Sequence, residues 1–351
     1  MRLLVTGYLI ARRTQRSMRR SAMRCHSPCS PLLTMVIIAF AALCTACNNE
    51  PLYNDSPLQD DTDKPLTGKI IFSAKRDGSD YHQIYTVNAN GSDLQQITSF
   101  TDINAYHPSW SPGRDEIVFQ SDTEIFRNAG AFILYRIAAD GSGLQRVKKD
   151  SLSFVMGSRP VWSPVGDMLA YFTCPRSNCR NLWVRDMEQG WAQGFGRGAY
   201  PAWSSDGAML AVTAYDAETE LMQVFIEADF FRGNFLGVRL TMTFTDKQTP
   251  VWSPDDSRIA FISGSQIMIH DLNYREDDEL TPVDNPDGRE PFELHAWVAD
   301  ENAEYLLATF EDKANLHYRK YYLYAVYARS GELSLIVPDS TLRGADWHMP
   351  Q

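Results

Sequence analysis

The sequence predicts an all-β fold, a six-bladed β-propeller that is closed by a C-terminal strand completing the first blade. Two observations predict it. A short phrase around a tryptophan occurs six times, and successive tryptophans stand 52, 41, 49, 45 and 50 residues apart. A repeat of this length with several short strands per unit is typical of propellers. In addition, the first unit lacks the phrase, whereas the chain ends on an extra copy. The six anchors are Trp110, Trp162, Trp203, Trp252, Trp297 and Trp347.

Residues 1–46 have the pattern of a lipoprotein-type signal peptide. They hold seven Arg, no Lys and no acidic residue, and an apolar run from Leu32 to Leu43 follows the Arg-rich part. That run is too short to span a membrane comfortably. Small residues stand directly before Cys47, which resembles the lipobox of bacterial lipoproteins and implies lipidation of Cys47. An ordinary cleaved signal and an uncleaved anchor remain open as alternatives.

The predicted location follows from the same segment. A lipid on Cys47 would hold the protein on the periplasmic side of the cell envelope. The residue after Cys47 is Asn48, and not the Asp that resembles a signal for retention in the inner membrane. We therefore expect the outer membrane. Residues 47–66 carry several prolines and the acidic run Asp60–Asp63, which is typical of a flexible, solvated tether. The propeller is predicted to occupy residues 67–351.

Each tryptophan phrase is predicted to form the innermost strand of a blade. Proline cannot donate to a sheet ladder and is confined to free edges, which the phrase would have at the central channel. The tryptophan two residues later shares a face with the proline and packs between blades, burying about 150–250 Å². Ser-Pro followed by Asp or Gly then makes a tight turn. The prolines are Pro108, Pro160, Pro201 and Pro250.

An apolar run and two further strands complete each unit. In the unit that begins at Trp110, these strands are predicted at residues 116–120, 132–137 and 144–147. The turns between the third and fourth strands carry Gly at residues 91, 141 and 331, where a positive φ is tolerated.

The strand count predicts how the ring closes. The first unit supplies strands at residues 69–73, 83–87 and 94–98, without an innermost strand. Residues 345–349 form an orphan tryptophan strand at the other end of the sequence. If that strand completes the first blade, the two ends are held together and no sheet edge stays exposed.

These repeats carry a family resemblance. The pattern Pro-x-Trp-Ser-Pro-Asp-Gly, followed by Ile-Ala-Phe and later by Ile-Tyr-x-Val, resembles the PD40 (WD40-like) repeat of the TolB propeller. The resemblance covers about residues 67–351. It implies a TolB-like propeller that receives its partners at one mouth of the central channel, here without the α/β domain that precedes the propeller in TolB.

The residues just before each tryptophan strand are the candidate binding residues. Inner strands all start at one mouth of the channel, so their first side chains converge there. Convergent polar groups of this kind suit a polar ligand or an inserted peptide. Solvated rim positions or packing between blades are the alternative. The candidates are Tyr106, His107, Arg159, Tyr200, Gln248, Glu293 and Arg343.

Two further patterns concern cysteine and histidine. Cys174 and Cys179 flank a short loop between two predicted strands. Cross-strand neighbours in a hairpin lie at disulfide distance, and an exported protein enters an oxidising compartment, so we predict a disulfide between them; two free thiols are the alternative.

His107, His295 and His348 could suggest a metal cluster. Their offsets from the tryptophans differ, so strand alternation would aim them at different faces. We therefore predict no metal site and no cofactor.

Composition favours binding over catalysis. Beyond residue 46 the chain has 26 basic and 44 acidic residues, a net charge of −18 that repels nucleic acid. Common hydrolase and nucleotide-binding motifs are absent. The sequence thus predicts a monomeric, non-enzymatic envelope protein that binds a protein segment or glycan and reaches the membrane through its lipid anchor alone. A metal-dependent polysaccharide lyase or hydrolase with a channel His cluster, and a structural envelope component, remain open as alternatives.

Overall fold

The computed structural model describes residues 66–76, 78–122, 132–149, 153–173, 181–228, 237–241, 245–273, 280–283, 289–300, 303–312 and 320–349. These residues belong to one compact unit, Leu66–Gln351, and the description below concerns that unit. Cys47, Cys174 and Cys179 lie outside the described residues, as do the predicted signal peptide and nearly all of the predicted tether.

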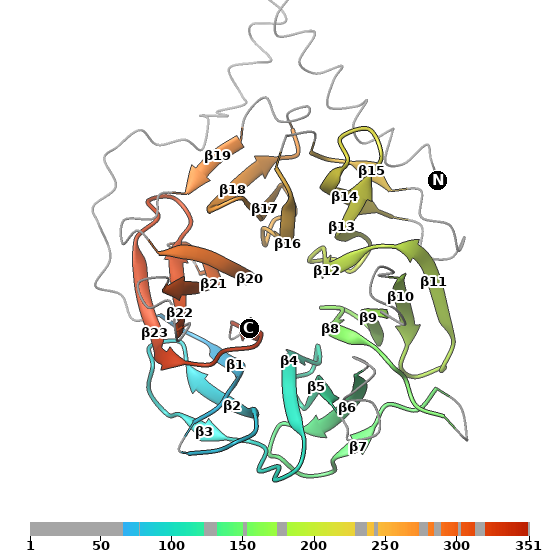
Figure 1. Cartoon of the computed structure of the whole chain (residues 1–351), viewed down its shortest axis with the longest axis vertical. Coiled ribbons are helices and arrows are strands. Elements are labelled where there is room, and N and C mark those ends of the chain that lie inside the picture. Colours follow the sequence, from blue (N-terminus) through green and yellow to red (C-terminus); the bar gives the residue numbers. More distant parts are fainter. Residues whose placement is uncertain are drawn as a thin grey trace, which may run out of the picture. The chain divides into compact units, whose positions relative to one another are not determined.

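The described strands form six four-stranded antiparallel sheets arranged as blades around a centre (Figure 1). The first blade contains β24 (Ala345–His348), β1 (Lys69–Ala74), β2 (Gln83–Asn88) and β3 (Gln95–Gln96). The second contains β4 (Asn104–Trp110), β5 (Glu116–Asp122), β6 (Ile133–Ala138) and β7 (Gln145–Arg146). The third contains β8 (Ser158–Trp162), β9 (Met168–Thr173), β10 (Asn181–Asp186) and β11 (Ala192–Arg197).

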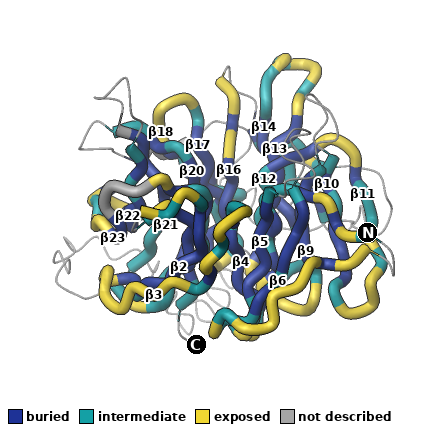
Figure 2. Tube along the Cα trace, turned by 60° about the horizontal axis from the view of Figure 1, so that its bottom comes forward, coloured by how far each residue is buried: buried dark blue, intermediate teal, exposed yellow. Residues whose placement is uncertain are grey.

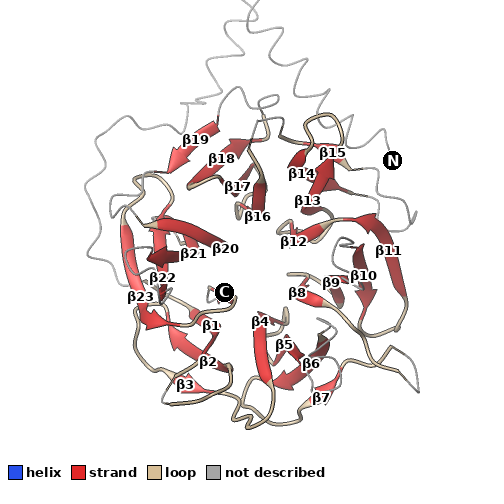
Figure 3. Ribbon diagram, viewed as in Figure 1, coloured by secondary structure: helices blue, strands red, loops and turns tan. Residues whose placement is uncertain are grey.

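The remaining three blades repeat this order. The fourth contains β12 (Ala199–Trp203), β13 (Leu210–Asp216), β14 (Leu221–Glu227) and β15 (Val238–Arg239). The fifth contains β16 (Lys247–Trp252), β17 (Arg258–Ser263), β18 (Gln266–Asp271) and β19 (Leu280–Val283). The sixth contains β20 (Glu290–Ala299), β21 (Glu304–Asp312), β22 (Lys320–Tyr327) and β23 (Leu333–Ser340). Figure 3 shows strands and loops throughout the described part of the chain, and no helix there is long and apolar enough to span a membrane.

The C-terminal strand closes the ring, which confirms the prediction. In β24, Trp347 pairs with Ile70 and Asp346 with Ile71, so β1 lies between β24 and β2. The indole Nε1 of Trp347 also donates to the carbonyl of Thr67 at 3.0 Å. The first blade is therefore built from both ends of the propeller sequence, and β1 has no free edge.

The outermost strands of the first two blades are shorter than the sequence predicted. Residues 94–98 were expected to form one strand, but the ladder of β3 covers two residues. Beyond it, the amide of Ile97 still donates to the carbonyl of Ile84 at 2.8 Å, but the amide of Ile84 donates to Thr98 Oγ1 at 2.9 Å instead of to a backbone carbonyl. A threonine hydroxyl can replace a strand partner in this way because it accepts from backbone amides.

The core lies between neighbouring blades. The tryptophan side of each inner strand packs on the preceding blade; Trp203, for example, contacts the cluster that contains Leu182 and Val184 of the third blade. All six anchor tryptophans are buried. Figure 2 shows the same division, with buried segments along the strands and exposed segments at the turns. The predicted packing of tryptophans between blades is confirmed.

Candidate functional site

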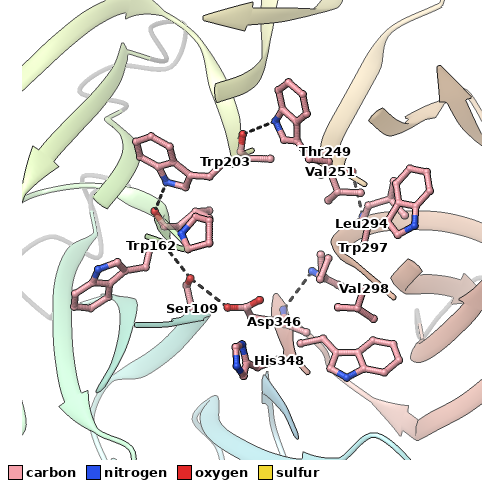
Figure 4. A pocket seen from close by; sticks show the side chains of 18 of the residues that line it. Ser109, Trp162, Trp203, Thr249, Val251, Leu294, Trp297, Val298, Asp346 and His348 are labelled. Carbon is pink, nitrogen blue, oxygen red and sulfur yellow. Dashed lines mark hydrogen bonds between the residues drawn. The ribbon is translucent and has the colours of Figure 1, made fainter. Parts of the chain in front are cut away.

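A cavity of about 480 Å³ lies on the axis of the ring. Its wall is made by the inner strands of all six blades, and Figure 4 shows side chains from these strands around it. The inner strands contact one another in the order β4, β8, β12, β16, β20, β24 and back to β4. In a closed ring of six, β8 and β20 stand on opposite sides of the channel, as Figure 1 also shows.

Hydrogen bonds join every neighbouring pair of inner strands along this wall, and Figure 4 draws several of them as dashed lines. Some donors are backbone amides and others are tryptophan indoles. Such ties fix the positions of the side chains that face the channel. The six bonds are Trp162 N to Ser109 Oγ (3.1 Å), Trp203 Nε1 to Val161 O (3.1 Å), Trp252 Nε1 to Ala202 O (3.1 Å), Leu294 N to Thr249 Oγ1 (3.1 Å), Ala345 N to His295 Nδ1 (3.3 Å) and Trp110 N to Asp346 Oδ2 (2.9 Å).

The residue before the proline of the repeated phrase has an unusual backbone conformation in four blades. His107, Arg159, Tyr200 and Thr249 have φ values of 48°, 48°, 52° and 44°, in the left-handed region that non-glycine residues seldom adopt. The strand register shifts at the same place in each of these four blades. A bulge of this kind re-aims the side chain, and here it turns the third residue before each tryptophan toward the channel.

The first blade meets the same requirement with glycine. Gly344 stands three residues before Trp347 and has a φ of 85°. A Cβ placed there would lie 2.4 Å from His107 Nδ1 and 2.6 Å from His107 Cα. Glycine therefore supplies both the backbone conformation and the space that the imidazole of His107 occupies.

Four polar side chains form a cluster, here called the channel cluster: His107, Arg159, Glu293 and His295. Arg159 Nη1 on β8 donates to Glu293 Oε1 on β20, so this ion pair crosses the channel. His107 Nδ1 and His295 Nδ1 lie 3.5 Å and 4.0 Å from the same carboxylate oxygen. The guanidinium also stacks on Tyr200, with Cζ 4.6 Å from the ring centroid.

The two imidazoles of the channel cluster are neutral at physiological pH. Burial lowers the pKa of His107 to about 3, and the charge of Arg159 acts in the same direction. Burial also lowers the pKa of His295 to about 4, although Glu293 opposes this shift. His295 Nδ1 accepts from the amide of Ala345, so Nε2 carries the proton and donates to Thr309 Oγ1 at 2.7 Å.

Two acidic groups of the wall behave differently. Burial would raise the pKa of Glu293, but the charge of Arg159 and the hydrogen bond from its guanidinium hold it at about 2. For Asp346 burial dominates and raises the pKa to about 6, against the hydrogen bonds from Trp110 N and Ser109 Oγ. Figure 4 shows Ser109 and Asp346 turned toward each other, with Oγ and Oδ2 3.3 Å apart. The channel thus holds one tightly ion-paired carboxylate and one that titrates near neutrality.

The structure brings four of the seven candidate residues to the cavity: His107, Arg159, Tyr200 and Glu293. The other three are placed elsewhere. Tyr106 packs on His82, with ring centroids 4.7 Å apart; Gln248 is exposed; and the guanidinium of Arg343 lies 4.9 Å from the ring centroid of Tyr321.

Register explains this division. The third residue before the tryptophan lines the cavity in all six blades, whereas the fourth residue lines it in the sixth blade alone. In that blade β20 carries two register shifts, one on each side of the segment that contains Glu293. Regular alternation cannot anticipate such shifts. The sequence analysis therefore chose Gln248 as its candidate instead of the neighbouring Thr249, and it missed Asp346, which stands one residue before its tryptophan.

The histidines do not assemble into a metal centre within the described ranges. No group of three or more His, Cys, Asp or Glu there is placed to hold a metal ion. His107 and His295 face the same carboxylate, whereas His348 lies further along the wall beside Asp346 (Figure 4). His107 lies beside Glu293, and His295 is hydrogen-bonded to Thr309 and to the amide of Ala345.

Comparison with known proteins identifies the fold. No family model and no curated protein matches the chain. The crystal structure of TolB from Acinetobacter baumannii superposes with a TM-score of 0.61 and 16% identity, covering 82% of this chain and 68% of that one. The fold is that of the TolB propeller. This confirms, at the level of fold, the resemblance seen in the repeats.

Two further structures show how widely this fold is used. The protein from Agrobacterium tumefaciens provisionally described as TolB gives a TM-score of 0.57 and 13% identity, over 81% of this chain and 99% of that one. A chain of Kuenenia stuttgartiensis hydrazine synthase gives 0.61 and 10%, over 82% and 48%. Because proteins with such different names share the TolB propeller fold, function must be argued from the site.

Proposed function

We propose that this protein is a non-catalytic binding protein of the cell envelope, which receives a protein segment or a glycan in its central channel. The channel cluster carries the proposal. It places a guanidinium, a carboxylate and two neutral imidazoles in a cavity of about 480 Å³, the size of a site for a small ligand or a few residues of a chain. Proline, alanine, valine and tryptophan residues of the inner strands contribute to the apolar part of the wall.

The setting of this proposal comes from the sequence. A signal peptide over residues 1–46 and a lipid on Cys47 would hold the propeller on the periplasmic side, at the outer membrane, as a monomer. The net charge of −18 beyond residue 46 disfavours nucleic acid as a partner. The likeness of fold to TolB supports the choice of a binding role, because the repeat resemblance implies partners at one mouth of the channel.

Site-specific photo-crosslinking tests the proposal. A benzoylphenylalanine replaces Tyr200, which lines the cavity, in the full-length protein. The matched control carries it at Tyr215 of the same blade, which is 52% exposed and outside the lining. After irradiation with an envelope extract, we expect discrete adducts from position 200 and not from position 215. Protease and glycosidase treatment of the adducts distinguishes a protein segment from a glycan.

Two crosslinking results would overturn the proposal. Adducts that form equally at both positions would show contact with the outer surface rather than the channel. If position 200 gives no adduct in any envelope fraction, a purely structural role is favoured instead.

A further inference from the structure

We infer that the channel accepts a cationic group, an amine or guanidinium of the ligand, which takes the place of Arg159 on the carboxylate of Glu293. In the protein without ligand, the guanidinium of Arg159 occupies the position that the ligand's cationic group would take. This inference rests on the proposed function of the channel and names the chemistry that the channel recognises.

The ion pair between Arg159 and Glu293 crosses the channel from one side to the other. Its two residues belong to β8 and β20, which stand opposite each other in the ring of inner strands. The ion pair lies where the inner strands begin, since its residues stand three and four positions before their tryptophans. A ligand that reaches the cavity from this end must therefore displace one of the two partners.

Arg159 is the partner that can move. Its side chain is 22% exposed, compared with 6% for Glu293. The guanidinium already rests on Tyr200, which offers a cation–π contact after the ion pair breaks. Glu293 has no such alternative, because it lies on the bulged strand β20 and is enclosed by His107 of β4 and by His295.

The remaining charges favour a cation in the vacated position. With both imidazoles neutral, Glu293 would be a buried carboxylate without a counter-charge, which is unfavourable unless a new cation pairs with it. Asp346 adds a second acidic group to the cavity lining, and Arg114 is the second arginine of that lining. The acidic body of the protein would also attract cations toward the channel.

An anionic ligand is disfavoured by the same geometry. To bind Arg159, an anion would have to displace the buried carboxylate of Glu293 and remain beside it. Two like charges in a channel of this size repel each other strongly. The two possibilities predict opposite effects for the same substitutions, so one experiment separates them.

The test uses the peptide acetyl-Gly-Gly-Arg-Gly-Gly-amide and the full-length protein. Its counterparts carry citrulline, a neutral isostere, or glutamate in place of arginine. By calorimetric titration we expect the arginine peptide to bind at least about tenfold more tightly than the citrulline peptide, as for other charge-assisted hydrogen bonds. Arg159→Ala removes the internal competitor and is expected to strengthen binding of the arginine peptide by about tenfold. Glu293→Gln is expected to abolish the preference for arginine over citrulline.

A matched control is available outside the cavity. Arg258 pairs with Glu304 at 2.6 Å and stacks on Trp297 at 4.9 Å, so it has the same chemistry as Arg159 without lining the channel. Arg258→Ala should leave binding of the arginine peptide unchanged. Thermal unfolding confirms that each variant is folded. If Glu293→Gln does not fold, the wild-type comparison of arginine with citrulline and the gain in Arg159→Ala still decide the question.

Three results would overturn the inference. They are tighter binding of the glutamate peptide, weaker binding of the arginine peptide by Arg159→Ala, or equal binding of the arginine and citrulline peptides. If one of these occurs while crosslinks at position 200 persist, the channel binds a partner of different chemistry and the proposed function stands. If the crosslinks are absent as well, both fail.

Discussion

The residue before the proline in each inner strand determines what the channel presents. Left-handed backbone is strained for ordinary residues, and most of all for β-branched Thr249. The strain persists because each such residue is tied to its neighbours: Thr249 Oγ1, for instance, accepts from Leu294 N. In four blades the bulge brings a side chain to the cavity wall, and in the first blade Gly344 leaves that space to His107.

Gly344→Ala should therefore be strongly destabilising. The new methyl would combine a positive φ with contacts to His107 closer than 3 Å, and we expect a loss of about 2–4 kcal/mol in the free energy of unfolding. Gly166→Ala is the control, because its φ is 71° but nothing lies within 4 Å of the added Cβ. There the loss should be about 1 kcal/mol. Urea unfolding of both variants measures the difference; equal losses would show that His107 yields without cost.

Asp346 should make stability depend on pH. Its folded pKa of about 6 lies above the ordinary value of 3.8, so the native state holds the proton more tightly than the unfolded chain does. This contribution favours folding at low pH and is lost as the pH rises toward about 6. Asp346→Asn retains an acceptor for Trp110 N and Ser109 Oγ without the charge. Relative to wild type, the variant should gain about 1–3 kcal/mol between pH 4 and pH 7.

The difference in stability between wild type and Asp346→Asn isolates the contribution of the Asp346 carboxyl group. His107 and His295 have lowered pKa values and favour folding at higher pH, but they are present in both proteins and cancel in the difference. Thermal unfolding at pH 4, 5, 6 and 7 provides the measurement. A constant difference across this range would show that Asp346 has the same pKa in the folded and unfolded states.

At the scale of the strand, the indole groups divide into two sets. Trp203 Nε1 and Trp252 Nε1 each donate to a carbonyl of the preceding inner strand. Trp162 Nε1, by contrast, is buried without a hydrogen-bond partner among the described residues. Trp203→Phe therefore loses a bond between two blades, whereas Trp162→Phe loses a similar volume and no such bond. We expect Trp203→Phe to be more destabilising by about 1 kcal/mol in urea unfolding; a greater loss in Trp162→Phe would contradict this account.

The inner strand also shows how far sequence reasoning reaches. Proline at a free edge and tryptophan between blades follow from residue chemistry, and both predictions are confirmed. The bulge has no comparable signal, because it depends on how neighbouring strands fit. Assuming regular alternation gave Gln248 equal weight with Glu293, although the structure exposes one and buries the other. The position three residues before each tryptophan would have been the better guide.

At the scale of the whole molecule, closure creates the site. The repeat count and the orphan strand were enough to predict that residues 345–349 complete the first blade. They could not predict that Arg159 meets Glu293, because that contact depends on β8 and β20 standing opposite each other in the finished ring. Asp346 and Gly344 belong to the closing segment itself, so the channel wall is incomplete until β24 has paired with β1.

Removal of the closing strand should therefore affect both stability and association. A chain that ends at Gly344 leaves β1 with a free edge, and such edges pair with other chains. It also lacks the buried ring of Trp347, whose loss alone would cost about 3–5 kcal/mol. We expect a lower unfolding temperature and concentration-dependent oligomers, measured by light scattering on a sizing column. A synthetic peptide of residues 343–351 should restore both properties, because it can pair with β1 as β24 does, whereas a scrambled peptide should not. A truncated chain that stays monomeric with unchanged unfolding would mean that the ring holds without its closing strand.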